Sequence, residues 1–359
     1  MQILLKNWLK GFIQKDFNKR LIFTTIIIIL ILLLLSVVSI TQGTVGINFE
    51  KIVDIILYKF GINKVVYWSK VEELIVWDLR FPRTILACVA GCGLAISGVA
   101  MQAAVKNPLA DPYILGISAG ASAGATAVIA ADLLDVTSEY SISIGAFVGA
   151  LLSMFLLFML NRGNRDSVRL LLSGCVISIL CSSITSIIMF FAKDKEKISS
   201  VTFWLMGSVS DANWEMIPII SIVVFIGIFL LVLYYRQLNA MLLGDEVAHT
   251  LGINTEQFRW KLVIIVALIV GAIVAFCGMI GFVGFVIPHI VRTIFGSNHK
   301  IVVPISAYIG ATFLLLCDII ARIIVIPEEI PIGIITSLIG APFFIYILEK
   351  KRVIFGGKK

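Results

Sequence analysis

The sequence has little charge. Only 14% of its 359 residues are Asp, Glu, Lys or Arg, whereas 59% are hydrophobic. Soluble domains carry about 25% charged residues, so this composition excludes a water-soluble fold. Intrinsic disorder is excluded as well, because disordered chains contain too few apolar residues to bury a core. The composition predicts a polytopic membrane protein.

The short motifs of metal and nucleotide chemistry are also missing. The six cysteines lie inside apolar runs and contain no C-x-x-C pair, so neither a zinc ribbon nor a disulfide framework is indicated. No H-E-x-x-H occurs, which gives a metalloprotease no support, and no G-x-x-x-x-G-K-[ST] occurs, so the chain has no P-loop for ATP. We expect no catalytic residue, metal or cofactor on this chain.

Long apolar runs are abundant. The first, residues 21–40, has twenty residues and no charge, enough to cross a hydrocarbon layer about 30 Å thick at about 1.5 Å per residue. Other runs lie near residues 82–105, 113–131, 141–160, 169–192, 216–235, 260–279, 281–295, 301–325 and 331–348. We therefore expect an all-α membrane protein with about ten transmembrane helices.

The distribution of charge orients these helices. If the N-terminus is cytoplasmic, the inner segments hold 19 of the 29 Lys and Arg and 7 of the 22 acids, and the outer segments hold 9 and 14. The positive-inside rule then places both termini in the cytoplasm and accounts for most of the net charge of +7. Spans two to five and seven to ten begin at opposite faces, which predicts an inverted-topology repeat.

A break follows the second run. It contains Asn107, Pro108 and Leu109, and proline cannot continue a helix. Such a break is usually a connector. A small residue then occupies every second position, which lets helices approach closely or leaves room for a pathway: Gly116, Ser118, Gly120, Ser122 and Gly124. This pattern predicts a helix that lines a substrate pathway.

The same residues fit a second pattern. Residues 116–120 match G-x-S-x-G, and His289 is a conceivable base for Ser118, so an intramembrane serine hydrolase is an alternative. A nucleophile elbow requires a strand, a turn and a helix. The motif lies in an apolar segment that is expected to be helical, which disfavours this alternative.

Charged residues are rare within the runs and are therefore candidate sites. Asp318 and Arg322 are four residues apart, which places them on one helical face as an ion pair. Arg322 also lies near the outer end of its run, where a docking role is an equal alternative. Arg80 and Arg83 lie where the second run begins, either as interfacial anchors or as a positive docking patch for an acidic partner.

An amphipathic segment, residues 238–253, lies between the sixth and seventh runs. Its apolar positions are Leu243, Val247, Ala248 and Leu251, and it is too short and too polar to span a bilayer. We expect a short cytoplasmic helix that either lies on the membrane surface or fits a groove on a partner protein.

Many of these motifs occur together in one family. The chain resembles the FecCD/BtuC-type permeases of ABC importers in residues 79–83 (LRFPR), 96–98, 102, 107–112 (NPLADP), 115–120 (LGISAG), 204–208 (WLMGS), 244–248 (GDEVA), 281–289 (GFVGFVIPH), 318, 321–322 and 340–344 (GAPFF), in family order and spacing. The resemblance covers roughly residues 75–357. Residues 1–74 match only as a cytoplasmic N-terminus, one span and an outer loop, and residues 75–359 form the permease core.

The resemblance implies a complex. A second permease, identical or paralogous, would pair with this one around a translocation channel, two ABC ATPase subunits would bind ATP below it, and a substrate-binding protein would dock above it. The residues that the family places against the binding protein correspond to Arg80, Arg83 and Arg322. Residues 241–252 resemble the coupling helix that fits the ATPase, in particular Leu243, Gly244, Asp245, Glu246, Val247, Ala248, Leu251 and Gly252.

The resemblance also implies a pathway and a cargo. Ser167 and Val168 occupy the place of a cytoplasmic gate, although the apolar Val168 departs from the hydroxyl found in some relatives. The cargo would be an iron-siderophore complex, with haem or cobalamin as alternatives, carried across the cytoplasmic membrane of a prokaryote.

An ion-coupled secondary transporter is a further alternative, for which Asp318 is the one candidate ionisable group near the midplane.

Overall fold

The computed structural model describes residues 2–43, 45–108, 110–131, 140–161, 167–192 and 194–355. This part of the chain is helical and contains no strand. In chain order its elements are α1 (Gln2–Thr41), α2 (Phe49–Lys59), α3 (Lys70–Leu74), η1 (Ile75–Arg80), α4 (Phe81–Val105), η2 (Pro112–Leu115), α5 (Ile117–Ala131), α6 (Ser141–Asn161), α7 (Ser167–Phe191), α8 (Lys195–Leu205), α9 (Met216–Leu233), α10 (Tyr235–Met241), α11 (Asp245–Thr250), α12 (Thr255–Cys277), α13 (Val283–Phe295), α14 (His299–Ile323) and α15 (Ile332–Phe355).

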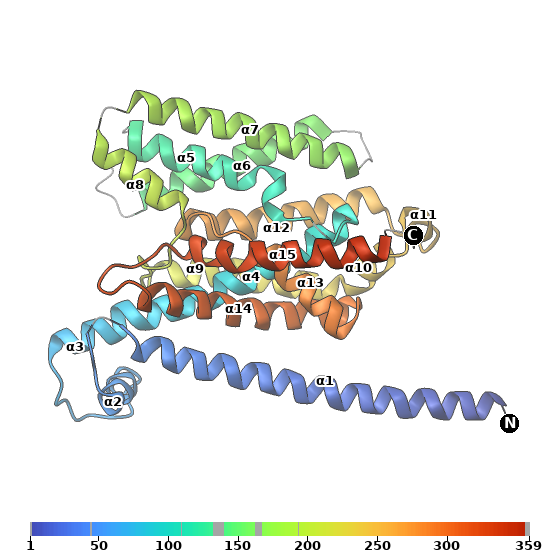
Figure 1. Ribbon diagram of the computed structural model, residues 1–359, viewed down its shortest axis with the longest axis horizontal. Coiled ribbons are helices and arrows are strands. Elements are labelled where there is room, and N and C mark those ends of the chain that lie inside the picture. The colour runs from blue at the N-terminus through green and yellow to red at the C-terminus, as the bar shows by residue number, and fades with distance from the viewer. Residues whose placement is uncertain are drawn as a thin grey trace.

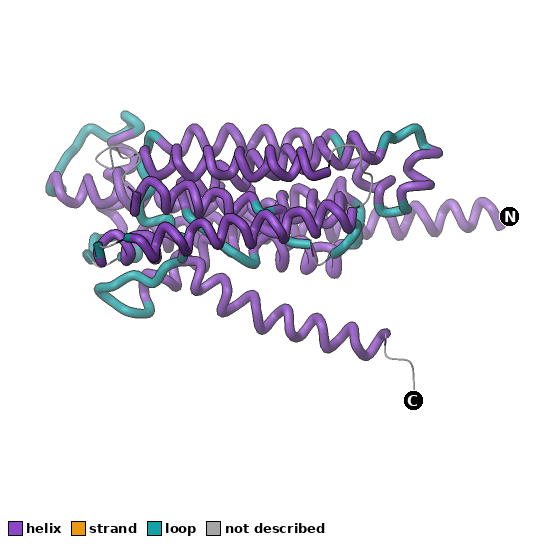
Figure 2. Tube along the Cα trace, turned by 90° about the horizontal axis from the view of Figure 1, so that it is seen from above, coloured by secondary structure: helices purple, strands orange, loops and turns teal. Residues whose placement is uncertain are grey.

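The ten expected spans correspond to helices of the structure. Seven segments are long and apolar enough to cross a membrane, in α1, α3 to α4, α6, α7, α9, α12 and α14. Three shorter apolar helices, α5, α13 and α15, complete the set. Figure 2 shows a bundle of helices side by side along one common direction, with the last helix, α15, splayed away from it toward the end marked C. The all-α prediction with about ten spans is confirmed.

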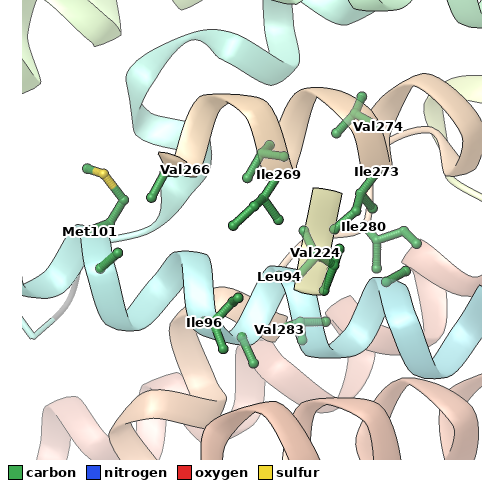
Figure 3. Close-up of a cluster of buried hydrophobic side chains, with 14 of the residues drawn as sticks. Leu94, Ile96, Met101, Val224, Val266, Ile269, Ile273, Val274, Ile280 and Val283 are labelled. Carbon is green, nitrogen blue, oxygen red and sulfur yellow. The ribbon is translucent and has the colours of Figure 1, made fainter. Parts of the chain in front are cut away.

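Helix α4 is the centre of the bundle. It contacts α14, α12, α13 and α9, and most of its residues are buried. Figure 3 shows apolar side chains of α4 and α12, including Leu94 and Ile269, meeting in the core. Small residues allow the closest crossings, since a Cβ on Gly98 would lie 1.7 Å from the carbonyl oxygen of Gly284 on α13. The core therefore forms around a helix that lipid does not reach over most of its length.

The two blocks of four spans have matching neighbours. In the first block α5 packs against α6 and α7, and in the second α13 packs against α14 and α15. Since α9 is one span between the blocks, successive helices alternate in direction and α4 and α12 run oppositely. This arrangement agrees with the inverted-topology repeat expected from the charges.

The two ends of the bundle differ. Figure 1 shows α2 and α3 at one end, called here the α2 end, and α11 at the other, called the α11 end, together with the start of α1 and the end of α15. At the α2 end a small second core forms around Ile52, Ile55 and Trp68. A continuous helical stretch from Lys70 to Val105 crosses the boundary expected at residue 74. A π-helical turn, η1, ends at Arg80, two residues before Pro82, whose missing N–H cannot support a regular helical bond.

Candidate functional site

Arg80 closes the end of α1. Its Nη1 donates hydrogen bonds to the carbonyl oxygens of Ile40 and Thr41, both at 3.1 Å, and its Nη2 donates to the carbonyl oxygen of Val45. The last four carbonyls of a helix have no partner within the helix, and a cation there also opposes the helix dipole. Arg80 is accordingly buried, with 6% of its surface exposed.

Arg83 and Arg322 share one carboxylate. Asp318, which is fully buried, accepts from Arg83 Nη2 at 2.8 Å through Oδ1 and pairs with Arg322 Nη2 at 2.7 Å through Oδ2. Arg83 also reaches Glu329 Oε2 at 2.7 Å. Arg322 donates to the carbonyl oxygen of Ser39 at 2.9 Å and to its Oγ at 2.6 Å. The expected Asp318–Arg322 pair is thus one part of a network that joins α1, α4 and α14.

The three predicted docking residues are brought together by this network. Arg80, Arg83 and Arg322 line one cavity of about 400 Å³ at the α2 end, which the π-helical turn and the loop after α1 also border. Their guanidinium groups already have partners inside the chain. Only Arg83, paired with the half-exposed Glu329, combines a charge with access to the surface. Binding-protein docking stays a prediction, and Arg83 is the residue of the three that suits it.

A larger cavity lies beside α15. It has a volume of about 730 Å³ and is bordered by Tyr113, Leu205, Met206, Met279, Gly281, Gly333, Ile334, Ser337, Leu338, Ala341, Pro342 and Ile345. The Tyr113 hydroxyl is engaged in the backbone, because it donates to the carbonyl oxygen of Ile280 at 2.8 Å and accepts from the Ile280 N–H at 2.9 Å. The wall is consequently mostly apolar and offers few directed polar contacts to a solute.

Sequence reasoning missed this cavity, called here the α15 cavity. A signal for it was present in the small residues Gly333, Ser337 and Ala341, which recur at intervals of four and place a smooth face on one helix. The proline at 342 inside the same helix was a second signal. The residues predicted for the pathway do not border it: none of Asn107, Pro108, Ser118, Gly120 and Val168 is among its lining residues.

Those pathway residues lie elsewhere. Asn107 and Pro108 form the turn after α4, where the Ala110 N–H donates to the Asn107 carbonyl oxygen at 3.0 Å, and Leu109 lies outside the described residues. Ser118 is 3% exposed in α5. A Cβ on Gly120 would lie 2.5 Å from the Gly149 carbonyl oxygen, so α5 packs closely on α6 there. Gly120 also borders a cavity of about 570 Å³ between α5, α6 and α7. The pathway therefore stays a prediction.

Two further predictions concern the cytoplasmic gate and the serine hydrolase alternative. Ser167 begins α7, and Val168 follows it with 57% of its surface exposed, so the gate stays a prediction. The G-x-S-x-G residues begin α5 after the turn η2, with Gly116 at φ +79°. No strand precedes them in the described chain, so the geometry of a nucleophile elbow is absent there.

The predicted coupling segment contains a shorter helix than expected. Helix α11 spans Asp245–Thr250, because Gly244 at φ +105° and Gly252 at φ +81° break the chain on either side. Leu243 and Leu251 are 63% and 62% exposed, whereas Ala248 is fully buried. Placing Ala248 on the free apolar face was therefore wrong. Its methyl group packs inward, and Leu243, Val247 and Leu251 form the exposed face.

Three charged side chains hold α11 to the bundle. Asp245 Oδ2 lies 2.6 Å from Lys106 Nζ and 3.3 Å from Arg259 Nη2, and Arg259 Nε donates to the carbonyl oxygen of Ala104 at 2.9 Å. Burial acts to raise the pKa of Asp245, but the hydrogen bond from Lys106 and the nearby charge of Arg259 outweigh it and lower this pKa. Asp245 is therefore held as a carboxylate between two cations.

Comparison with known proteins assigns the chain to a family. Residues 21–350 match the FecCD transport family. The chain is 40% identical over 281 residues to the hemin transport system permease HmuU of Yersinia pestis, covering 77% of this chain and 84% of that protein. It is 37% identical to the cobalamin import system permease BtuC of Halobacterium salinarum over 78% of this chain and 75% of that protein. It is also 37% identical to the Fe(3+)-citrate import system permease YfmD of Bacillus subtilis, over 86% of this chain and 90% of that protein.

Solved structures give the same result at the level of the fold. A metal-chelate type ABC transporter in an inward-facing conformation aligns with a TM-score of 0.79 and 30% identity, over 93% of this chain and 99% of that chain. The resemblance seen in the sequence motifs is confirmed. The chain belongs to the FecCD transport family and is a membrane permease of the ABC importer class.

Proposed function

We propose that this chain is the permease subunit of an ATP-driven importer that carries an iron chelate, an iron-siderophore complex in the first instance, across the cytoplasmic membrane of a prokaryote. It would pair with a second permease, receive its cargo from a binding protein at the α2 end and bind two ATPases at the α11 end. Both termini would then be cytoplasmic, as the positive-inside rule predicts.

The exposed apolar face of α11 is the observation that carries this proposal. Leu243, Val247 and Leu251, within α11 or directly beside it, are exposed on this segment. An idle helix on an anionic membrane surface would favour basic residues, but this segment has Asp245 and Glu246 and no Lys or Arg. A groove on a partner protein fits better. The sequence has no P-loop, so the partner would supply the ATP hydrolysis.

The nature of the cargo rests on the relatives. Their names refer to hemin, cobalamin and ferric citrate, which are all metal chelates. Hemin and ferric citrate contain iron, and further relatives are vitamin B12 import permeases, so an iron chelate and cobalamin are the two cargoes that the test below separates. The apolar α15 cavity gives this chain few groups with which to discriminate among such solutes, so selectivity would come mainly from the binding protein.

The test of the cargo uses the cognate binding protein. Ferric citrate, a ferric hydroxamate, a ferric catecholate, hemin and cyanocobalamin would each be titrated into the purified protein, with quenching of its fluorescence as the readout. Saturable binding of a ferric siderophore supports the proposal. Saturation by cyanocobalamin alone would replace it with the cobalamin alternative, and saturation by hemin alone with the haem alternative.

The test of the energy source uses membrane vesicles. Uptake of the bound cargo should require ATP and the ATPase subunits, and it should persist when ionophores collapse the ion gradients. Uptake that follows a proton or sodium gradient without ATP would support the secondary transporter instead. The buried Asp318 is paired with two arginines, which makes it a poor carrier of such an ion.

A further inference from the structure

The ion pairs around Asp245 link α11 to the most buried helix of the fold. Lys106 follows the last residue of α4, and Arg259 bonds to the carbonyl oxygen of Ala104, two residues before Lys106. Asp245 is the first residue of α11. These three side chains, called here the Asp245 clamp, connect the coupling segment with the end of α4 and with α12.

The left-handed backbone conformation of Lys106 indicates that this position uses the lysine side chain for the ion pair with Asp245. Lys106 has φ +56° and ψ +31°, the left-handed region in which glycine is the usual residue after a helix. A lysine accepts this conformation only at a cost in backbone strain. Its ammonium lies 2.6 Å from Asp245 Oδ2, so the strained position delivers a cation to α11 that a glycine would not.

Helix α4 is tied by ion pairs at its other end as well. Arg83, in its first turn, bonds to Asp318 of α14 at 2.8 Å and to Glu329 at 2.7 Å. Between these ends the helix is packed on four neighbours at glycine crossings. Packed interiors transmit displacement because they have few voids. A shift imposed on α11 therefore has a continuous route to the cavity at the α2 end.

We propose that Asp245 is a positioning residue which, through Lys106 and Arg259, makes α11 and the inner end of α4 move as one body. This inference rests on the proposed function, since it takes the ATPase as the protein that moves α11. It assigns to α4 the transmission of that movement toward the Arg83 network, and it assigns to the clamp no role in holding the ATPase.

The test reports movement at the far end of α4. The complex of the permease with its ATPase would carry an environment-sensitive dye at Leu79→Cys, an exposed position just before α4, with the exposed Cys175 changed to Ser. Adding MgATP with orthovanadate should shift the emission of the dye. Asp245→Asn should reduce this shift about fivefold, at the low end of typical allosteric couplings, while the ATPase still co-purifies.

Matched variants separate the clamp from a general effect. Asp245→Glu keeps the charge and should restore most of the shift. Lys106→Gly relieves the strained backbone but removes the ammonium, so it should lose the shift as Asp245→Asn does, and the two together should lose no more than either alone. Lys261→Gln removes an exposed lysine of α12 outside the clamp and should leave the shift intact.

The outcomes are distinct. If the wild-type permease does not co-purify with an ATPase, the proposed function itself fails. If the ATPase binds but the wild-type dye gives no shift, or if Asp245→Asn and Lys106→Gly retain the full shift, the transmission through α4 is wrong. A loss of the shift in Lys261→Gln equal to that in Lys106→Gly would show a general charge effect and would also overturn the clamp.

Discussion

At the scale of single residues, the three arginines at the α2 end have two different structural roles. Arg80 and Arg322 donate to carbonyl oxygens in the last turn of α1, so each is a structural cap supplied by another helix. Arg83 bridges a buried and a half-exposed carboxylate. The three residues look alike in the sequence, and only their partners separate a cap from a candidate docking residue.

Replacing Arg80 by alanine should destabilise the protein. The change removes the donor to the buried carbonyl oxygen of Ile40 and the part-buried one of Thr41, and hydrogen bonds to a charged group contribute about 1.5–3 kcal/mol each. We expect a lower midpoint of thermal unfolding in detergent and greater proteolysis near residue 42. An unchanged midpoint would show that α1 does not depend on this cap.

A substitution of Arg83 tests docking of the binding protein. Arg83→Gln keeps the length of the side chain and removes the charge, and rim charges act mainly on the rate of encounter and on its salt dependence. We expect weaker binding of the binding protein at low ionic strength, with the difference from wild type shrinking as salt is added. Equal affinity at all salt concentrations would limit Arg83 to its internal ion pairs.

Gly98 tests the closest crossing of the fold. An alanine there would place its Cβ 1.7 Å from the Gly284 carbonyl oxygen, which belongs to buried backbone and cannot move aside as a side chain could. The helices must separate, so we expect a loss of more than about 4 kcal/mol in stability, or no folded protein. Gly46→Ala is the control, because its Cβ would meet no atom within 4 Å and should leave the unfolding midpoint unchanged.

At the scale of elements, α11 shows how a short segment presents a surface. Its inward methyl group at Ala248 anchors it, and the clamp residues fix its first turn, which leaves Leu243, Val247 and Leu251 outside. A glutamate at Ala248 would break packing within this chain and would say nothing about a partner. The informative position is an exposed one.

Leu251→Glu should release the ATPase. If this side chain enters a groove on the ATPase, the new carboxylate would be desolvated without a partner, which costs several kcal/mol. We expect loss of ATPase co-purification and of uptake, with normal insertion and normal docking of the binding protein. Thr250→Glu changes the neighbouring exposed residue, and its effect on ATPase co-purification indicates how far the groove extends. Wild-type co-purification of Leu251→Glu would exclude the segment from coupling.

At the scale of the whole molecule, the α15 cavity is one candidate space for a solute. Ser337→Trp would place an indole within its volume of about 730 Å³, on a helix that has room for it. We expect folded protein and ATPase binding but strongly reduced uptake. Ser186→Trp on the exposed side of α7 is the control. Full uptake by Ser337→Trp would place the pathway elsewhere.

The sequence was sufficient for the architecture. Twenty uncharged residues such as 21–40 must form a helix in a bilayer, because every backbone polar group there needs an internal partner. The excess of Lys and Arg in alternate connections then predicts how the spans are oriented in the membrane, and this orientation stays a prediction. The break at residues 106–112 could be located as well, since proline acts on the local backbone. The glycines that end α11, Gly244 and Gly252, were not recognised as helix ends in the sequence.

Only the tertiary structure decided what each charged or small residue does. Asp318 meets Arg83 from 235 positions away in the chain, and Arg80 meets the end of a helix that precedes it, which no local pattern encodes. The small residues of α5 could serve a pathway or a helix crossing; packing brings Gly120 close to Gly149 and also leaves both at the edge of a cavity, so the pathway stays a prediction. Hydropathy and charge act along the chain and were readable there, whereas partners and cavities arise from packing between distant segments.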